Sequence, residues 1–113
     1  MNILNLTGNL NGLSAADETL IRDTLLADQI LVYPTDTLYG LGADATSDVA
    51  VNTLYELKSR TNAPVSILVE SVEALLGMTT QLSESAQRLI STFMPGALTV
   101  ICKSDYSFAS KLF

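Results

Sequence analysis

The fold of this chain is decided by the stretch Tyr33-Pro34-Thr35-Asp36-Thr37-Leu38-Tyr39-Gly40-Leu41-Gly42-Ala43-Asp44. It follows Ile30-Leu31-Val32, an apolar run typical of a buried strand. This twelve-residue stretch is too short to build a core, yet it contains two threonine hydroxyls, aspartate carboxylates, two tyrosines and two glycines. Because open α/β sheets bind ligands where buried strands end, this stretch predicts a binding site.

Strand and helix patterns alternate along the rest of the chain, which predicts an α/β fold. Serines precede helical patterns at positions 14, 47, 71 and 83 and are predicted N-caps, the first within a capping box. Apolar runs predict strands at 30–33, 66–70 and 98–102, with a short edge strand at 3–6. One helix has a face predicted to be buried, formed by Ala50, Val51, Leu54, Tyr55 and Leu57. Residues 105–113 show no clear periodicity.

Length and composition narrow the class of protein. The 113 residues, 48% of them apolar, predict one domain over 1–113 with a modest core. The net charge of −6 disfavours loose, sequence-independent binding to nucleic acid. We expect a cytoplasmic location with no membrane association, because no apolar run approaches a bilayer span and no signal peptide is evident.

The chemistry available to the chain is limited by its residue types. There is no histidine, which excludes histidine acid–base catalysis and serine–histidine triads. The lone Cys102 excludes an internal disulfide and a cysteine-based zinc site, and its strand pattern predicts a buried side chain. Catalysis would therefore depend on carboxylates, hydroxyls, lysine, arginine, backbone N–H groups and a borrowed Mg²⁺.

The threonines and glycines of the motif each allow two interpretations. Thr35 and Thr37, alternate residues of an extended segment, would face the same way and either bind a ligand or cap the local backbone. Gly40 and Gly42 would bring backbone N–H groups to an anion or form a tight loop before the next helix. Tyr39 would either flank a small substrate or pack at the edge of the core, and packing at the core edge is favoured.

A basic pair, Lys58 and Arg60, ends the second helical pattern. Cations at this position interact favourably with the helix dipole. Two residues apart, they do not share a helix face and converge on a phosphate only if the chain leaves the helix between them. Ser66 begins the following apolar run and either bonds a ligand or lies on the polar side of the strand; the latter is favoured.

These motifs, in this order, resemble the YrdC/Sua5 family of threonylcarbamoyl-AMP synthases. The likeness rests on PTDTLYGLG at 34–42, on Lys58-Ser59-Arg60, and on Met94-Pro95-Gly96-Ala97-Leu98-Thr99. It extends from about Leu20 to about Cys102. The resemblance implies a YrdC-like α/β fold, with a twisted mixed sheet and flanking helices.

The resemblance also implies an activity and roles for residues. Members combine ATP, L-threonine and bicarbonate into threonylcarbamoyl-AMP and pyrophosphate, for threonylcarbamoyladenosine modification of tRNA. Thr35 and Thr37 would bind L-threonine, with Thr37 in the better-matched place. Lys58 and Arg60 would be catalytic and bind the nucleotide, together with Ser66. Mg²⁺ would bridge the pyrophosphate, with no metal ligands from the protein.

The sequence departs from the family pattern in two places. Thr61 follows Arg60 where the family has proline, and Pro64 comes about one residue early. The family's later Arg-x-Pro and Ser-Ala-Asn segments are not found in the sequence, so we expect a domain incomplete at its C-terminus and impaired in activity. Alternatives are a YrdC-like module that binds double-stranded RNA or tRNA without catalysis, and a homodimer joined through an open sheet edge.

Overall fold

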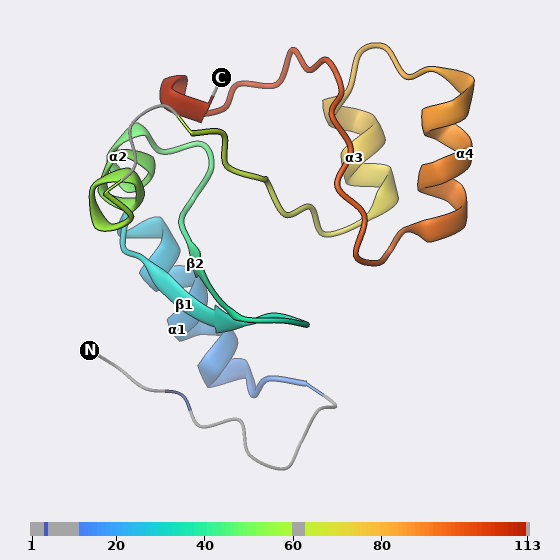
Figure 1. Cartoon of the computed structure of the whole chain (residues 1–113). Helices are drawn as coiled ribbons and strands as arrows, with labels where there is room; N and C mark the ends of the chain where they lie inside the picture. The colour runs from blue at the N-terminus through green and yellow to red at the C-terminus, as the bar shows by residue number, and fades with distance from the viewer. Residues whose placement is uncertain (1–3, 5–11, 60–62, 113) are drawn as a thin grey trace. The chain divides into compact units, whose positions relative to one another are not determined.

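The computed structural model describes residue 4 and residues 12–59 and 63–112. These residues form a mixed α/β structure with two compact units (Figure 1). The first unit comprises the described residues up to 63 together with 109–112, and the second unit comprises 64–108. The predicted strand at 3–6 lies outside the described residues, apart from Leu4. A single domain over 1–113 stays a prediction.

The first unit begins with helix α1, Ala15–Leu26, which lies alongside a β-hairpin (Figure 1). Its capping box is present as predicted. Ser14 Oγ accepts a hydrogen bond from the Asp17 N–H at 3.2 Å, and the Asp17 carboxylate accepts one from the Ser14 N–H at 3.2 Å. This reciprocal pair satisfies donors that a helix start leaves open.

The hairpin consists of β1, Leu31–Pro34, and β2, Tyr39–Gly42, paired antiparallel with Leu31 opposite Gly42 and Pro34 opposite Tyr39. Strand β1 confirms the predicted strand, whereas β2 corrects the loop predicted around the glycines. A Cβ on Gly42 would lie 2.9 Å from Tyr33 Cε1. The glycines therefore let the Tyr33 ring cross β2.

Tyr39, predicted to pack at the core edge, is 78% exposed. It begins β2 directly after the exposed turn, where no other element covers it within the described residues. The prediction for this side chain was wrong.

Helix α2, Asp48–Leu57, begins at the predicted N-cap Ser47, whose hydroxyl accepts from the Ala50 N–H at 3.2 Å. The same hydroxyl donates to Asp28 at 2.5 Å and so joins the helix start to the segment before β1. The buried face is Ala50, Val51, Leu54 and Tyr55. Leu57 is 60% exposed, contrary to prediction, because two residues beyond Tyr55 a side chain points to the opposite side of a helix.

A short 3₁₀ helix, η1, Ser110–Leu112, packs against α2 and buries Leu112. The neighbouring Ala109 is buried as well, and its N–H donates to the Ala45 carbonyl at 2.8 Å. This packing was not predictable from local sequence patterns, because the residues that η1 contacts lie some sixty positions earlier in the chain.

The second unit contains α3, Val72–Met78, and α4, Glu84–Phe93, which start at the predicted N-caps Ser71 and Ser83. Each helix buries one residue, Leu75 and Ile90 respectively. The segment after α4 returns to the α3–α4 connection, where the Thr80 N–H donates to the Lys103 carbonyl at 3.0 Å. The Ser104 hydroxyl donates to the Met78 carbonyl at 2.5 Å.

The predicted strands 66–70 and 98–102 are not strands in the structure. Within the described residues, neither segment pairs with another strand. Side-chain burial nevertheless alternates residue by residue over 63–70 and 97–105, the period of an extended chain. The alternation of apolar residues correctly predicted an extended backbone, but a β-strand also requires hydrogen bonds to a neighbouring strand. Cys102, predicted to be buried, is half-buried.

Candidate functional site

The turn between β1 and β2 carries Thr35 and Thr37. The Thr35 N–H donates to the Leu38 carbonyl at 3.1 Å, and the Thr35 hydroxyl donates to the same carbonyl. Thr35 Oγ1 also accepts from the N–H groups of Leu38 at 3.1 Å and Thr37 at 3.3 Å. The Thr35 side chain is thus engaged by the turn, which favours the interpretation that it caps the local backbone.

Thr37 occupies a different environment on the same turn. Its hydroxyl lies 3.5 Å from Thr35 Oγ1, its one hydrogen-bond neighbour among the described residues, and the side chain is exposed. The two threonines meet because the chain bends over 36–38, and not because they alternate on an extended strand as predicted. The Thr37 hydroxyl therefore has the hydrogen-bonding capacity that a ligand would use.

Lys58 is the C-cap of α2 and is half-buried. Ser59 adopts the left-handed conformation, with φ of 48°, and its N–H donates to the Glu56 carbonyl at 3.0 Å. A residue in this conformation is a common way to end a helix and redirect the chain. The chain therefore leaves the helix directly after Lys58, the departure that convergence with Arg60 requires. Arg60 lies outside the described residues, and its convergence with Lys58 stays a prediction.

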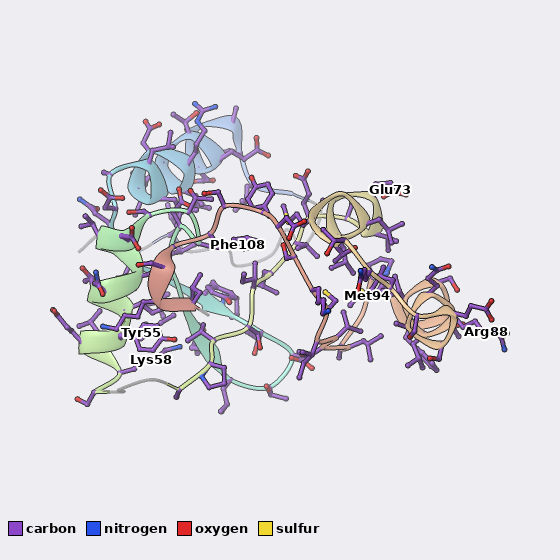
Figure 2. All side chains as sticks on the ribbon, turned by 90° about the horizontal axis from the view of Figure 1, so that it is seen from above. Tyr55, Lys58, Glu73, Arg88, Met94 and Phe108 are labelled. Atoms are coloured by element: carbon purple, nitrogen blue, oxygen red, sulfur yellow. The ribbon has the colours of Figure 1, made fainter. Side chains whose placement is uncertain are left out.

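The region around Lys58 includes contacts that the sequence did not reveal. The Tyr55 hydroxyl donates to the Ala63 carbonyl at 2.8 Å, and Lys111 Nζ lies 5.0 Å from the centroid of the Tyr55 ring. Figure 2 labels Tyr55 and Lys58 on α2. The spacing of three residues between them was the available signal that they share a helix face.

Ser66 is exposed and belongs to the second unit. It occupies an outward position of the burial alternation over 63–70, which agrees with the favoured interpretation as a polar strand residue. A nucleotide-binding role together with Lys58 stays a prediction.

One carboxylate in the first unit has a perturbed acidity. Asp48 Oδ1 accepts hydrogen bonds from the Ser110 hydroxyl and the Ser110 N–H, each at 2.8 Å. These bonds stabilise the charged form and hold the pKa of Asp48 below its usual value of 3.8. The group ties η1 to the first turn of α2 and is structural.

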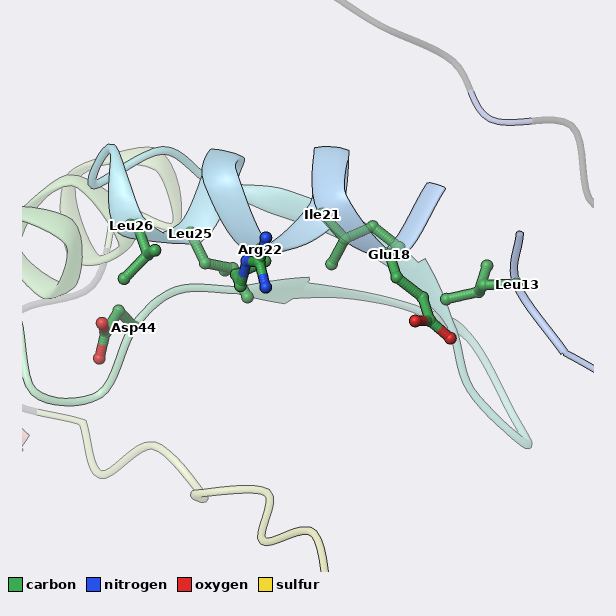
Figure 3. A pocket seen from close by; sticks show the side chains of 7 residues that line it. All are labelled: Leu13, Glu18, Ile21, Arg22, Leu25, Leu26 and Asp44. Carbon is green, nitrogen blue, oxygen red and sulfur yellow. The ribbon is translucent and has the colours of Figure 1, made fainter. Parts of the chain in front are cut away.

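Two surface hollows lie away from the predicted residues. One, of about 480 Å³, runs along α1 and is shown in Figure 3; it is lined by Leu13, Glu18, Ile21, Arg22, Leu25, Leu26 and Asp44. The other, of about 550 Å³, lies on α4 and is lined by Glu84, Ser85, Arg88 and Leu89. Neither is lined by a threonine of the hairpin turn or by Lys58.

The described residues contain no group of three or more histidine, cysteine, aspartate or glutamate side chains placed to hold a metal ion. They also contain no helix with the length and apolar character needed to cross a membrane.

Known proteins resemble this chain in sequence and in structure. A profile of the family Sua5_yciO_yrdC, described as telomere recombination, matches residues 23–113. A Mycobacterium tuberculosis protein is 42% identical over 76 residues, which are 66% of this chain and 35% of that protein. The threonylcarbamoyl-AMP synthase of Bacillus subtilis is 38% identical over 84 residues, covering 72% of this chain and 24% of the synthase.

The structural comparison agrees with these relatives. The crystal structure of Pyrococcus abyssi Sua5 complexed with L-threonine matches with a TM-score of 0.80 and 26% identity, over 90% of this chain and 30% of that one. This chain therefore spans about a quarter to a third of the relatives it matches. The family profile over residues 23–113, together with the structural match over 90% of the chain, shows that the chain belongs to the Sua5/YrdC family.

Proposed function

We propose that this chain forms the part of a threonylcarbamoyl-AMP synthase that binds L-threonine and the phosphates of ATP. The observation that carries the proposal is the exposed hydroxyl of Thr37, presented by a turn that Thr35 stabilises through its own hydrogen bonds. The name of the Bacillus subtilis relative and the L-threonine bound to Pyrococcus abyssi Sua5 support it.

In this proposal, the hairpin turn binds L-threonine and the end of α2 binds the phosphates of ATP. Thr37 donates to or accepts from L-threonine, while Thr35 holds the turn in shape. Lys58 and Arg60 bind phosphate oxygens, and their positive charge stabilises the transition state as negative charge shifts to the leaving pyrophosphate. Ser66 adds a hydroxyl to the nucleotide site.

The proposed reaction requires alignment more than acid–base catalysis. The threonine amine attacks the carbon of bicarbonate, and loss of water leaves a carbamate. A carbamate oxygen then attacks the α-phosphorus of ATP, and the bond to the β-phosphate oxygen breaks to release pyrophosphate. Holding the carbamate in line with that bond supplies most of the acceleration, which suits a chain without histidine.

The described residues provide no cage of carboxylates for a resident magnesium ion. We therefore assign Mg²⁺ to the substrate, as MgATP, because magnesium commonly binds through nucleotide phosphates and water. No step of the proposed mechanism depends on a protein ligand to the metal.

The relatives are about three to four times as long as the part that this chain matches, which limits how much of the reaction we assign to the chain. Because it spans about a third or less of the relatives compared above, we propose that by itself it makes the adenylate weakly or not at all. We propose that the threonylcarbamoyl-AMP is used in the cytoplasm to modify tRNA.

The RNA-binding alternative gains no support from the described cations. The Arg22 side chain lies 3.8 Å from that of the adjacent Asp23 in α1, and the Arg88 side chain lies 3.7 Å from that of Glu84 in α4; all of these side chains are exposed. Lys58, Lys103 and Lys111 come from other elements. Among the described residues, no single element carries the row of cations that backbone binding to RNA requires.

Calorimetric titration of L-threonine into the purified chain tests the proposal. We expect binding by the wild type, loss of binding in Thr37→Val, and retention in Thr92→Val, a matched change on the exposed face of α4. Equal binding by the wild type and Thr37→Val would reject the assignment of Thr37. Robust ATP-dependent synthesis of threonylcarbamoyl-AMP by the isolated chain would reject the proposed impairment.

A further inference from the structure

We infer that Tyr33 is a positioning residue for the turn that presents Thr37, an inference that rests on the proposed function. Tyr33 lies on β1, where it is paired with Gly40 across the hairpin. A Cβ on Gly40 would lie 3.0 Å from Tyr33 Cζ, and one on Gly42 would lie 2.9 Å from Tyr33 Cε1. The ring therefore occupies the space that side chains at both glycine positions of β2 would otherwise fill.

Strand β2 has few side chains of its own to fix its shape. Two of its four residues are glycines, which have no side chain to pack and adopt a wide range of backbone conformations. In the part of the chain that the structure describes, β2 has β1 as its strand partner and no other. A two-stranded hairpin is only marginally stable in water by itself. The hairpin therefore depends on cross-strand contacts, and an aromatic ring lying across a glycine is an effective one.

The Tyr33 ring lies close to the turn that carries Thr37. Tyr33 and Gly40 form the second pair from the turn in the register of the hairpin. Hydrogen bonds of 3.1 Å between Thr35 and the Leu38 backbone fix the shape of the turn itself. They do not fix the direction in which the turn points, which follows from the twist of the strand pairs that lead into it. The ring therefore influences where the Thr37 hydroxyl is held.

Holding the turn in one direction favours the binding of a small ligand. A hairpin that samples several twists presents the Thr37 hydroxyl correctly for only a fraction of the time, and the apparent Kd rises by the inverse of that fraction. The ring suppresses these alternatives in the free protein, so less conformational freedom is lost on binding. Tyr33 acts through the hairpin and does not itself touch the substrate.

A purely stabilising role for the ring makes a different prediction. If Tyr33 only added stability to the first unit, another substitution with a similar effect on unfolding would affect binding equally. Ser14→Ala provides this comparison, because it removes the N-cap of α1 and leaves the hairpin residues unchanged. Tyr33→Phe tests the ring itself, because phenylalanine keeps the ring carbons that lie against both glycines.

The experiment compares the wild type with Tyr33→Ile, Tyr33→Phe and Ser14→Ala. Isoleucine removes the ring and keeps an apolar side chain that favours strands. Calorimetry measures the Kd values of L-threonine and MgATP. For Tyr33→Ile we expect an L-threonine Kd raised about three- to fivefold, the effect of losing one cross-strand contact, and an unchanged MgATP Kd. Tyr33→Phe keeps the wild-type affinities, and Ser14→Ala keeps them despite a lower urea midpoint.

Two further measurements make the test independent of a single variant. Nuclear magnetic resonance detects contacts between the ring protons of residue 33 and the α-protons of Gly40 and Gly42, which we expect in the wild type and in Tyr33→Phe. Gly42→Ala displaces the same ring from the side of β2, because the added Cβ would lie 2.9 Å from Tyr33 Cε1. It should raise the L-threonine Kd as Tyr33→Ile does.

Other outcomes overturn the inference or the function separately. An unchanged L-threonine Kd in Tyr33→Ile would overturn the inference, as would an equal rise in Ser14→Ala or a failure of Tyr33→Phe to keep the affinity. If the wild type binds no L-threonine, the threonine part of the proposed function fails. Amide hydrogen exchange of the peptide spanning 31–42 then decides the role of the ring. Equal protection in Tyr33→Ile and the wild type would overturn the inference without reference to ligand, whereas faster exchange in Tyr33→Ile would support it.

Discussion

Asp48 and Ser110, 62 positions apart in sequence, are joined by two hydrogen bonds of 2.8 Å to a single carboxylate oxygen. The pair fastens η1 to the first turn of α2, at the opposite end of the helix from Lys58. A negative charge in the first turn of a helix is also favourable in itself. The contact therefore joins the chain's last described segment to the helix that carries a predicted phosphate ligand.

This contact predicts a specific pH dependence of stability. The folded state lowers the pKa of Asp48, so the stabilisation is present above the usual value of 3.8 and is lost as the pH falls through the lowered folded value. We expect Asp48→Asn to lower the urea midpoint at neutral pH. The difference from wild type should shrink as the pH is taken below about 3.8. A difference in urea midpoint between Asp48→Asn and the wild type that grew on acidification would contradict this prediction. Asp105→Asn, in the second unit, serves as the control.

The two threonines of the hairpin turn should separate stability from binding. Thr35→Val removes an acceptor for two N–H groups and should destabilise the first unit by about 1 kcal/mol. Thr37→Val should change stability by less than about 0.5 kcal/mol, because its hydroxyl is exposed. Urea unfolding measures both, and a larger stability loss in Thr37→Val would reverse the roles assigned here.

Ser59→Gly should stabilise the chain. Ser59 holds φ of 48°, a conformation that costs an L-residue about 1 kcal/mol and costs glycine little. We expect a gain of about 1 kcal/mol in thermal unfolding, with no gain from Ser107→Gly, whose backbone is not left-handed. A loss of stability in Ser59→Gly would show that the serine side chain contributes an interaction of its own.

Gly42→Ala should disturb the hairpin through Tyr33. The added Cβ would lie 2.9 Å from Tyr33 Cε1, so the ring or β2 must shift, at a cost of about 1–3 kcal/mol. The cost should fall when Tyr33→Ala removes the ring, which a double-mutant cycle measures. Gly77→Ala, where a Cβ meets nothing within 4 Å, is the control. An undiminished cost without the ring would point to the backbone.

Lys58→Met should weaken MgATP binding about tenfold or more, the effect of removing a charge-assisted hydrogen bond, and leave L-threonine binding unchanged. The residual MgATP binding should depend less on salt than that of the wild type, because one screened charge pair is lost. Calorimetry at two ionic strengths measures both effects, with Lys103→Met as the charge-matched control. Equal effects from the two substitutions would assign Lys58 a general electrostatic influence.

Local signals in the sequence predicted the helices well. Ser14, Ser47, Ser71 and Ser83 each cap a helix as expected, because capping depends on residues within one turn. The buried stripe of α2, apart from Leu57, was predicted for the same reason, since it repeats at helical spacing. The strand β1 followed from its apolar run and the proline that ends it.

Features that depend on distant partners were not predictable. The hairpin partner β2 reads as a loop because its glycines are explained only by the Tyr33 ring. The packing of η1 depends on Asp48, and the hydrogen bond to the Ala63 carbonyl depends on the hydroxyl of Tyr55, a residue that the sequence marks only as core. In the candidate site, the motif indicated the threonines, whereas the division of roles between Thr35 and Thr37 depends on the turn geometry.

The alternating segments 63–70 and 97–105 have a practical consequence for anyone handling this protein. Leu68 is 77% exposed and Ile101 fully so, on extended backbone whose amides lack a ladder within the described residues. Such backbone is a template for self-association. Purification yield should therefore depend steeply on concentration, and a charged substitution at Ile101 is the first change to try for keeping the chain dispersed.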